Sequence, residues 1–339
     1  MASAPLIDLR AARAAARLVL PSAASDGAAA AQLRLRVAEE LGSIDAAARR
    51  WTQLGVDLPP TEARVVGRMG WVDANLRVLA GVVGQMSPAG TQPFGGAQLI
   101  GAQLGTMLGL LSTRVLGQFV LPLAESGAGQ LVVVGPNVIA LGRRTPHLVD
   151  DLRRTVLLHE VAHRLQFDGV AWLGPHLRGL VAGYVSDGAG DPAMLARLVT
   201  RLPQAIIDAL RGGGFESVLH AVLSPSQRAA LDETQALMSL LEGHGNATMR
   251  LAAPGVVDDP DGVSAALSSR RDDVGAKLLR AVGGLARKER QYTEGEAFVR
   301  EVVAQCGVAG LNRVFGEPGS LPRPHEIADP ARWLGRIAA

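Results

Sequence analysis

Residues Val149 to Phe167 read VDDLRRTVLLHEVAHRLQF, and this segment decides the fold. Its apolar residues recur at spacings of three and four, which predicts a helix. Asp150 and Asp151 fall in the first turn, where acidic side chains favour the positive end of the helix dipole. Apolar residues flank the motif His159-Glu160-Val161-Ala162-His163 on both sides. We therefore expect a buried helix that carries a polar motif.

This motif has the residue types and the spacing of a catalytic zinc site. His159 and His163 are four residues apart, so both rings lie on one face of a helix and can reach one ion. Glu160 lies about 100° further around the helix, where its carboxylate can touch a metal-bound water without binding the metal. Zinc lowers the pKa of that water towards about 7, and the glutamate accepts its proton during attack on a carbonyl. These residues predict zinc-dependent hydrolysis of an amide bond.

Two other interpretations of the motif stay open. The first is an ordinary core helix whose two histidines are hydrogen-bonded, but two histidines and an acid on one buried helix are hard to satisfy without a metal. The second is a structural zinc ion in a binding or regulatory protein without turnover. A structural site has no use for Glu160, so the sequence favours an enzyme.

The third zinc ligand must come from another part of the chain. Metzincins have Gly and His three and six residues after the second histidine, and here Gln166 and Gly169 occupy those positions. A second helix is expected from the capping box Ser224-Pro225-Ser226-Gln227 to about Met249. Glu242, which follows Leu240 and Leu241 and precedes Gly243, is the preferred ligand because it completes a two-histidine, one-glutamate set. The remaining alternatives are His244, His220 and His176.

Three more residues are candidates for supporting roles. Asn246 follows Glu242 by four residues, so it shares its helix face and could hydrogen-bond a ligating histidine. His244 does not share that face, and we interpret it as a substrate-side or transition-state donor. Tyr292 could stabilise an oxyanion with its phenol group, although a core tyrosine is the competing interpretation.

Four separate motifs stand out in the chain: LLHEVAHRLQF (157–167), LLEGHGNATM (240–249), RKERQYTEGEAFV (287–299) and LPRPHEIADPARWL (321–334). They resemble motifs of the bacterial zincin-like proteins grouped as zinc-dependent metallopeptidases, and more narrowly those of a subgroup associated with deazaflavin-coenzyme biosynthesis. The resemblance extends from about Trp71 to the C-terminus. It implies a mainly helical zincin-type fold, with zinc on His159, His163 and Glu242 and with Glu160 as the catalytic base. In the non-catalytic alternative, the chain would be a metal-stabilised binding or regulatory protein associated with coenzyme biosynthesis.

Composition narrows the class of protein. The 339 residues are 48% hydrophobic and 19% charged, which allows a packed core and argues against wholesale disorder. The net charge of +2 is spread along the chain without a basic run, so nucleic acid is not expected as a partner. Cys306 is the only cysteine, and the N-terminal segment is a poor match to a signal peptide. We expect a cytoplasmic enzyme that acts on a peptide or protein.

One uncharged stretch requires a membrane test. Phe94 to Thr113 has about the twenty residues that a spanning helix needs. Ala97, Gly101, Gly105 and Gly109 fall four apart, a small-residue stripe that lets helices approach closely. Glutamines interrupt the stretch and no aromatic belt flanks it, so we expect a tightly packed core helix rather than a membrane span.

The rest of the chain predicts a mainly α (α+β) fold. Helices are also expected around Trp172–Val185 and Asp191–Arg211. A β-hairpin is expected from Gln130–Val134 and Val138–Leu141, separated by Gly135-Pro136-Asn137, and we place it beside the motif helix. We expect an N-terminal helical region over residues 1–85 and a zincin-like metallohydrolase region over 86–339, packed as one compact unit.

Overall fold

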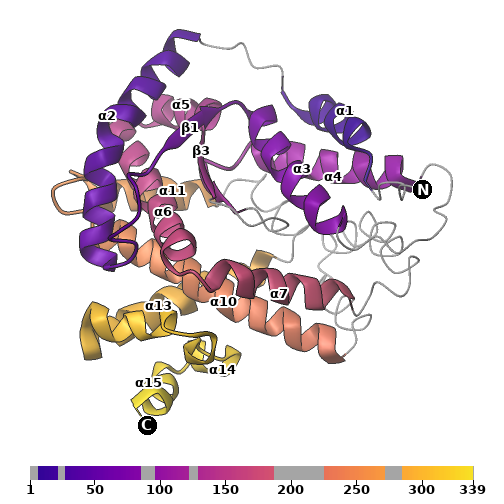
Figure 1. Ribbon diagram of the computed structural model, residues 1–339. Coiled ribbons are helices and arrows are strands. Elements are labelled where there is room, and N and C mark those ends of the chain that lie inside the picture. Colours follow the sequence, from indigo (N-terminus) through magenta and orange to yellow (C-terminus); the bar gives the residue numbers. More distant parts are fainter. Residues whose placement is uncertain are drawn as a thin grey trace.

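The computed structural model describes residues 7–21, 27–84, 96–121, 129–186, 225–271 and 285–338. These residues form mostly helices around a small three-stranded sheet (Figure 1), which confirms the mainly helical α+β fold. The strands are β1 (Ala63–Val66), β2 (Gly117–Val120) and β3 (Gln130–Val134). The longer helices are α1 (Leu9–Val19), α2 (Gly27–Thr52), α3 (Arg68–Gly84), α4 (Gly96–Ser112), α5 (Gly135–Arg144), α6 (Val149–Gly169), α7 (Leu173–Ser186), α10 (Pro225–Leu251), α11 (Pro260–Arg271) and α13 (Leu285–Leu311).

The sheet has the strand order β1-β3-β2. β1 runs parallel to the central strand β3, with Ala63 opposite Leu131. β2 runs antiparallel to β3, with Phe119 opposite Leu131, and it forms an edge of the sheet. The Leu116 carbonyl accepts the Val134 N–H, and hydrogen-bonded pairs alternate along an antiparallel ladder. The backbone groups of Gly117 and Phe119 therefore point away from β3, towards the free edge.

The expected hairpin is wrong in its second strand. Val138–Leu141 belongs to the helix α5, and the antiparallel partner of Gln130–Val134 is β2 instead. Pro136 lies in the first turn of α5, where its fixed φ and its missing N–H favour a helix start. The Asn137 side chain donates to the carbonyls of Ser112 and Val115, 2.7 and 2.6 Å away, which ties this start to the end of α4.

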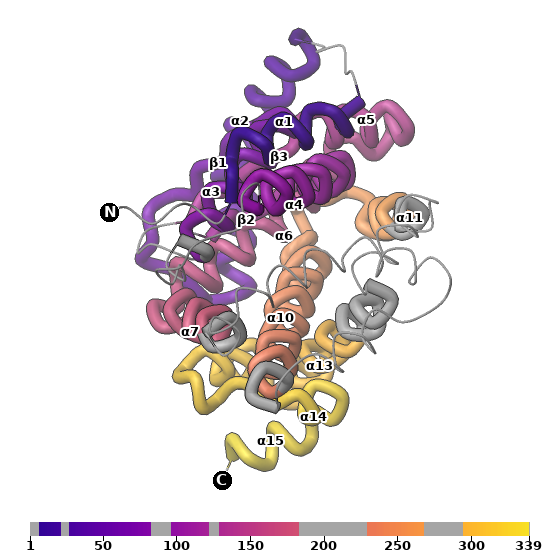
Figure 2. The backbone as a smooth tube through the Cα atoms, turned by 90° about the vertical axis from the view of Figure 1, so that its right-hand side faces the viewer, coloured from indigo at the N-terminus to yellow at the C-terminus, as the bar shows by residue number. Residues whose placement is uncertain are grey.

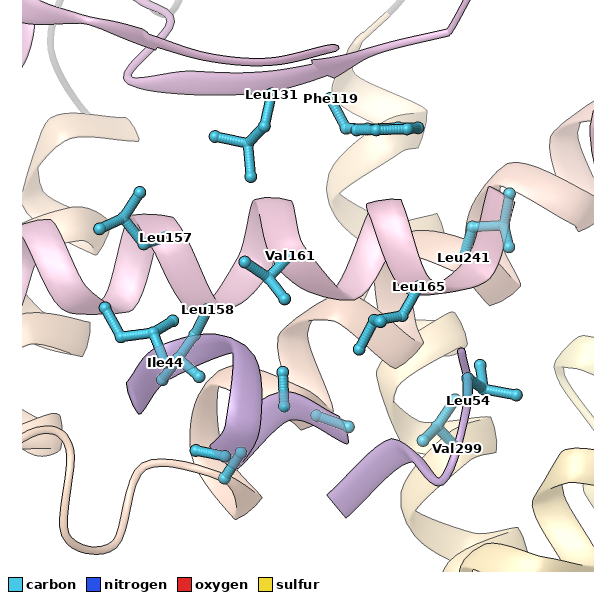
Figure 3. Close-up of a cluster of buried hydrophobic side chains, with 14 of the residues drawn as sticks. Ile44, Leu54, Phe119, Leu131, Leu157, Leu158, Val161, Leu165, Leu241 and Val299 are labelled. Atoms are coloured by element: carbon cyan, nitrogen blue, oxygen red, sulfur yellow. The ribbon is translucent and has the colours of Figure 1, made fainter. Parts of the chain in front are cut away.

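The predicted motif helix is confirmed as α6, which lies between the sheet and α2. Figure 3 shows Leu131 and Phe119 reaching down from the strands and Ile44 of α2 on the opposite side of α6. Leu157, Leu158, Val161 and Leu165 of α6 are fully buried in this layer. Because its leucine and valine faces are enclosed from two sides, α6 is a rigid base for side chains on its remaining face.

The predicted second helix is confirmed as α10, which runs the length of the lower part of the molecule (Figure 2). It packs against α6, α7 and α13. α13 leads to two short C-terminal helices, α14 (Pro324–Ile327) and α15 (Pro330–Ala338). α14 packs against α10 and α13, and α15 packs against α13, at the bottom of the view in Figure 1. The helix expected at Asp191–Arg211 lies outside the described residues.

Both sides of the expected domain boundary near residue 85 contribute to the larger core. Val37 and Ile44 of α2 share that core with Leu158 of α6 and Leu240 of α10. The division into 1–85 and 86–339 itself stays a prediction.

The uncharged stretch forms α4, and its glycine stripe packs against α1. A Cβ on Gly101 would collide with the backbone of Asp8, the N-cap of α1, and a Cβ on Gly105 with the backbone of Ala12. A Cβ on Gly109 would collide with the Val19 side chain and press against the backbone of Ala16. Ala12 and Ala16 are themselves fully buried, so two small-residue faces meet. Among the described residues, no helix has both the length and the apolar character needed to cross a membrane.

We expect Gly105→Ala to destabilise the protein, because the new Cβ would overlap the Ala12 carbonyl oxygen and force α1 away from α4. The loss should be about 1–3 kcal/mol in the free energy of unfolding, measured by urea denaturation. Gly42→Ala is the matched control, since a Cβ there meets nothing within 4 Å. That variant should be as stable as the wild type or gain up to about 1 kcal/mol. Equal stability of both variants would contradict the packing argument.

Candidate metal centre

Side chains from α6 and α10 bring three donor atoms together. His159 and His163 each offer a ring nitrogen and Glu242 offers a carboxylate oxygen, all within 4.8 Å of one another. The two Nε2 atoms are 3.1 Å apart. Oε2 of Glu242 lies 3.3 Å from Nε2 of His159 and 3.8 Å from Nε2 of His163. In the part of the chain that the structure describes, this is the one such group of three histidine, cysteine or acidic residues.

The donor set fits a zinc ion. Two imidazole nitrogens and one carboxylate oxygen are the ligands that zinc takes in catalytic sites. Burial would raise the pKa of the Glu242 carboxyl, but its hydrogen bonds to His159 and His163 hold that pKa well below its usual range. Three electron-rich atoms this close need a positive charge among them, which a metal ion would supply in place of a proton on an imidazole ring. His159, His163 and Glu242 are therefore the residues that would hold it.

Glycines next to Glu242 explain how the two helices come this close. A Cβ on Gly245 would lie 2.9 Å from Cε1 and 3.0 Å from Nδ1 of His159, so only a glycine leaves room for the ring. A Cβ on Gly243 would collide with the backbone of Gly295 in α13. The sequence Glu-Gly-His-Gly thus allows contact with α6 on one side and with α13 on the other.

Glu160 is buried beside the cluster and is held by the edge strand. Its Oε2 accepts a hydrogen bond of 2.8 Å from the backbone N–H of Phe119. Burial raises the pKa of Glu160, and the neighbouring Glu242 charge adds to that rise, whereas His159 and His163 lower it. A Cβ on Gly117 would come within 2.8 Å of Cγ of Glu160, so the glycine lets the edge strand reach the helix. One carboxylate oxygen is thus fixed by the backbone.

Gln166 is a site residue that the sequence analysis missed. Its side chain is fully buried, and its Oε1 lies 2.9 Å from Nδ1 of His163. Its Nε2 donates to the Leu241 carbonyl at 3.0 Å and lies 2.9 Å from Nδ1 of His244. The sequence signal that could have revealed Gln166 is its position three residues after His163, which puts both side chains on one helix face.

His244 lies in the interior, behind Gln166. Its ring is fully buried and packs against Trp51 and Phe315, with ring centroids 5.3 and 5.4 Å away. Burial, followed by the nearby His163 charge, lowers its pKa to about 3, so the ring is neutral. These contacts favour a role in which His244 holds the Gln166 side chain, rather than the expected role of hydrogen-bond donor to substrate.

The other predicted residues have different outcomes. Asn246 is half-buried on α10, and no hydrogen bond joins it to His159 or His163 in the described structure. Gln166 makes the contact to a ligand ring that was expected of Asn246. Tyr292 falls within α13, but its side chain lies outside the described residues. Of the alternative ligands, His176 packs against Trp172 and is not part of the cluster, and His220 lies outside the described residues.

A buried helix with His-Glu-x-x-His, faced by a glutamate from a second helix, defines the zincin class of metal-dependent hydrolases. A model of the family described as zincin-like metallopeptidase matches residues 7–334. The chain belongs to this family. The narrower resemblance to a subgroup associated with deazaflavin-coenzyme biosynthesis stays a prediction.

A solved structure agrees with this assignment. The chain is 26% identical to a proposed hydrolase with a novel fold from Chloroflexus aurantiacus. The match covers 98% of this chain and 99% of that chain, with a TM-score of 0.68. No curated protein matches the chain.

Zinc binding should strengthen as the pH rises. Burial alone would lower the pKa of His163, but Glu242, Glu160 and Gln166 outweigh it and raise that pKa to about 9. The metal-free ring is therefore protonated at neutral pH, and the ion must displace this proton. Between about pH 6 and 8 the apparent association constant should rise roughly tenfold per unit, measured by competition with a chelator. A flat profile would contradict a protonated His163.

Proposed function

We propose that the protein is a zinc-dependent hydrolase of the gluzincin type that cleaves an amide bond in a peptide or protein. His159, His163 and Glu242 would hold the ion, and Glu160 would act as the general base. The observation that carries the proposal is the position of Glu160, buried beside the three donor atoms with one oxygen anchored by a backbone N–H. A structural metal site would not need that carboxylate.

The surroundings of Glu160 suit proton transfer. When bound, zinc polarises a carbonyl and lowers the pKa of a coordinated water to about 7. Oε2 of Glu160 is anchored by the Phe119 N–H, whereas Oε1 accepts no hydrogen bond from the described residues. Oε1 is therefore the atom that would take the water proton. The raised pKa of the Glu160 carboxyl makes it a stronger base than an exposed glutamate. As the C–N bond breaks, the same proton passes from Glu160 to the leaving amine.

The edge strand supports an extended substrate. β2 has no partner strand on its outer side among the described residues, and Glu160 contacts it at Phe119. A peptide can add to such an edge by main-chain hydrogen bonds, which places its carbonyl groups next to the base. The N–H of Phe119 is already used by Glu160, so pairing would depend on the other outward groups of β2.

We expect Glu160→Gln to keep its zinc and to lose hydrolysis of a peptide library. Removing the base should lower kcat by about 10²–10⁴-fold, while the three ligands are unchanged. Glu242→Ala is the companion variant and should lose zinc as measured by elemental analysis. Unchanged turnover in Glu160→Gln would remove the base assignment. Full zinc content in Glu242→Ala would move the third ligand elsewhere. A wild type that binds zinc without cleaving any peptide would support the binding or regulatory alternative.

Replacing Phe119 by proline should slow hydrolysis, because it removes the N–H that anchors Glu160. This N–H points away from β3, so the strand ladder is kept, and proline is tolerated at edge positions of this kind. Phe119→Ala is the matched control, since it removes the same buried ring but keeps the N–H. We expect kcat of the proline variant to be at least about tenfold below that of the alanine variant. Equal kcat values in the two variants, both folded by circular dichroism, would show that the anchor is not needed.

A further inference from the structure

Both polar atoms of the Gln166 side-chain amide are hydrogen-bonded within the site. The side chain is fully buried and contacts a ring nitrogen of His163, the Leu241 carbonyl and a ring nitrogen of His244. An amide group offers two N–H donors and one carbonyl oxygen. The three contacts account for both donors and for the oxygen.

The Leu241 carbonyl determines which way the amide faces. A carbonyl oxygen only accepts, so the atom of Gln166 beside it must be the NH₂ nitrogen. The Oε1 of Gln166 then faces His163, and Nδ1 of that ring must carry a hydrogen to donate to it. With this hydrogen on Nδ1, the neutral His163 ring would offer the lone pair of Nε2 to an ion held together with His159 and Glu242.

The same side chain connects the two helices that carry the ligands. Gln166 is on α6 with both histidines. Its side-chain nitrogen donates a hydrogen bond to the carbonyl of Leu241, the residue before Glu242 in α10. The distance between the histidine pair and the carboxylate is therefore tied to this bond. His244 lies deeper in the interior, and its Nδ1 accepts the second N–H of the Gln166 amide.

The other histidine ligand has no such support. Nδ1 of His159 is buried and has no hydrogen-bond partner within the described ranges. Its ring is placed by packing over Gly245 instead. Among the described contacts, Gln166 is the one side chain that sets the tautomer of a ligand ring.

We propose that Gln166 is a positioning residue for the metal: it fixes His163 in the Nδ1–H tautomer and sets the spacing of α6 and α10. The proposal rests on the proposed function, because it concerns the same metal ligands. Outer hydrogen bonds of this kind typically change metal affinity by about 10–100-fold.

The test compares three full-length variants by zinc affinity, measured on metal-free protein in competition with a chelator. Gln166→Leu removes the acceptor and both donors, and it should weaken zinc binding by about 10–100-fold. Gln166→Glu keeps an acceptor for His163, and as a buried protonated acid it can still donate to Leu241, so it should stay within about fivefold of the wild type. Asn246→Ala removes a nearby amide that has no hydrogen bond to either histidine among the described residues, and it should bind zinc like the wild type.

A second measurement uses only the wild type and does not depend on a variant that folds. Long-range ¹H–¹⁵N spectra of the zinc-loaded protein, labelled on histidine, should show His163 with a hydrogen on Nδ1. A bare Nδ1 on His163 would overturn the proposal. So would an unchanged affinity in Gln166→Leu, or equal losses in Gln166→Leu and Gln166→Glu. If the wild type itself binds no zinc, the proposed function fails first, which separates the two failures.

Discussion

The site depends on one interaction, the approach of the Glu242 carboxylate to the two imidazoles where α10 crosses α6. A glutamate that is mostly withdrawn from water needs a cation or a shared proton beside it. The crossing is close because small residues stand at the contacts, with Gly245 under His159 and Gly243 against Gly295. The architecture around it, with α13 behind α10 and the sheet above α6, keeps these backbones in place.

The rotation of α6 about its own axis is set by the residues that do not face the metal. Arg153 makes two hydrogen bonds of 2.7 Å with Glu40 of α2. Arg164 donates to the Thr61 hydroxyl and to the Pro59 carbonyl, at 2.7 and 2.8 Å. Charged pairs at a surface contribute little, but both arginines are buried, and a turn of α6 would leave them without partners. These contacts fix the rotation of α6, so the rings of His159 and His163 face Glu242.

Local patterns were enough to predict much of this protein. The spacing of four between His159 and His163 predicted that both rings would share a face of α6, and the capping box predicted α10 with Glu242 near its end. The expected hairpin was wrong because Pro136 starts a helix there. Gln166 stands three residues after His163, but its other partners, Leu241 and His244, lie 75 and 78 residues away. It was missed because no local pattern shows which side chains the packing of two helices will bring together.

The anchor of Glu160 is a peptide group, and this affects how the site can be recognised in other sequences. The N–H of Phe119 is present whatever side chain residue 119 carries, proline excepted. A comparison of amino-acid identities would therefore register the packing of the buried Phe119 ring but not the hydrogen bond made by its N–H. Another apolar side chain at this position could leave the carboxylate in the same orientation. Part of this candidate site is thus set by backbone geometry, which residue-by-residue alignment cannot record.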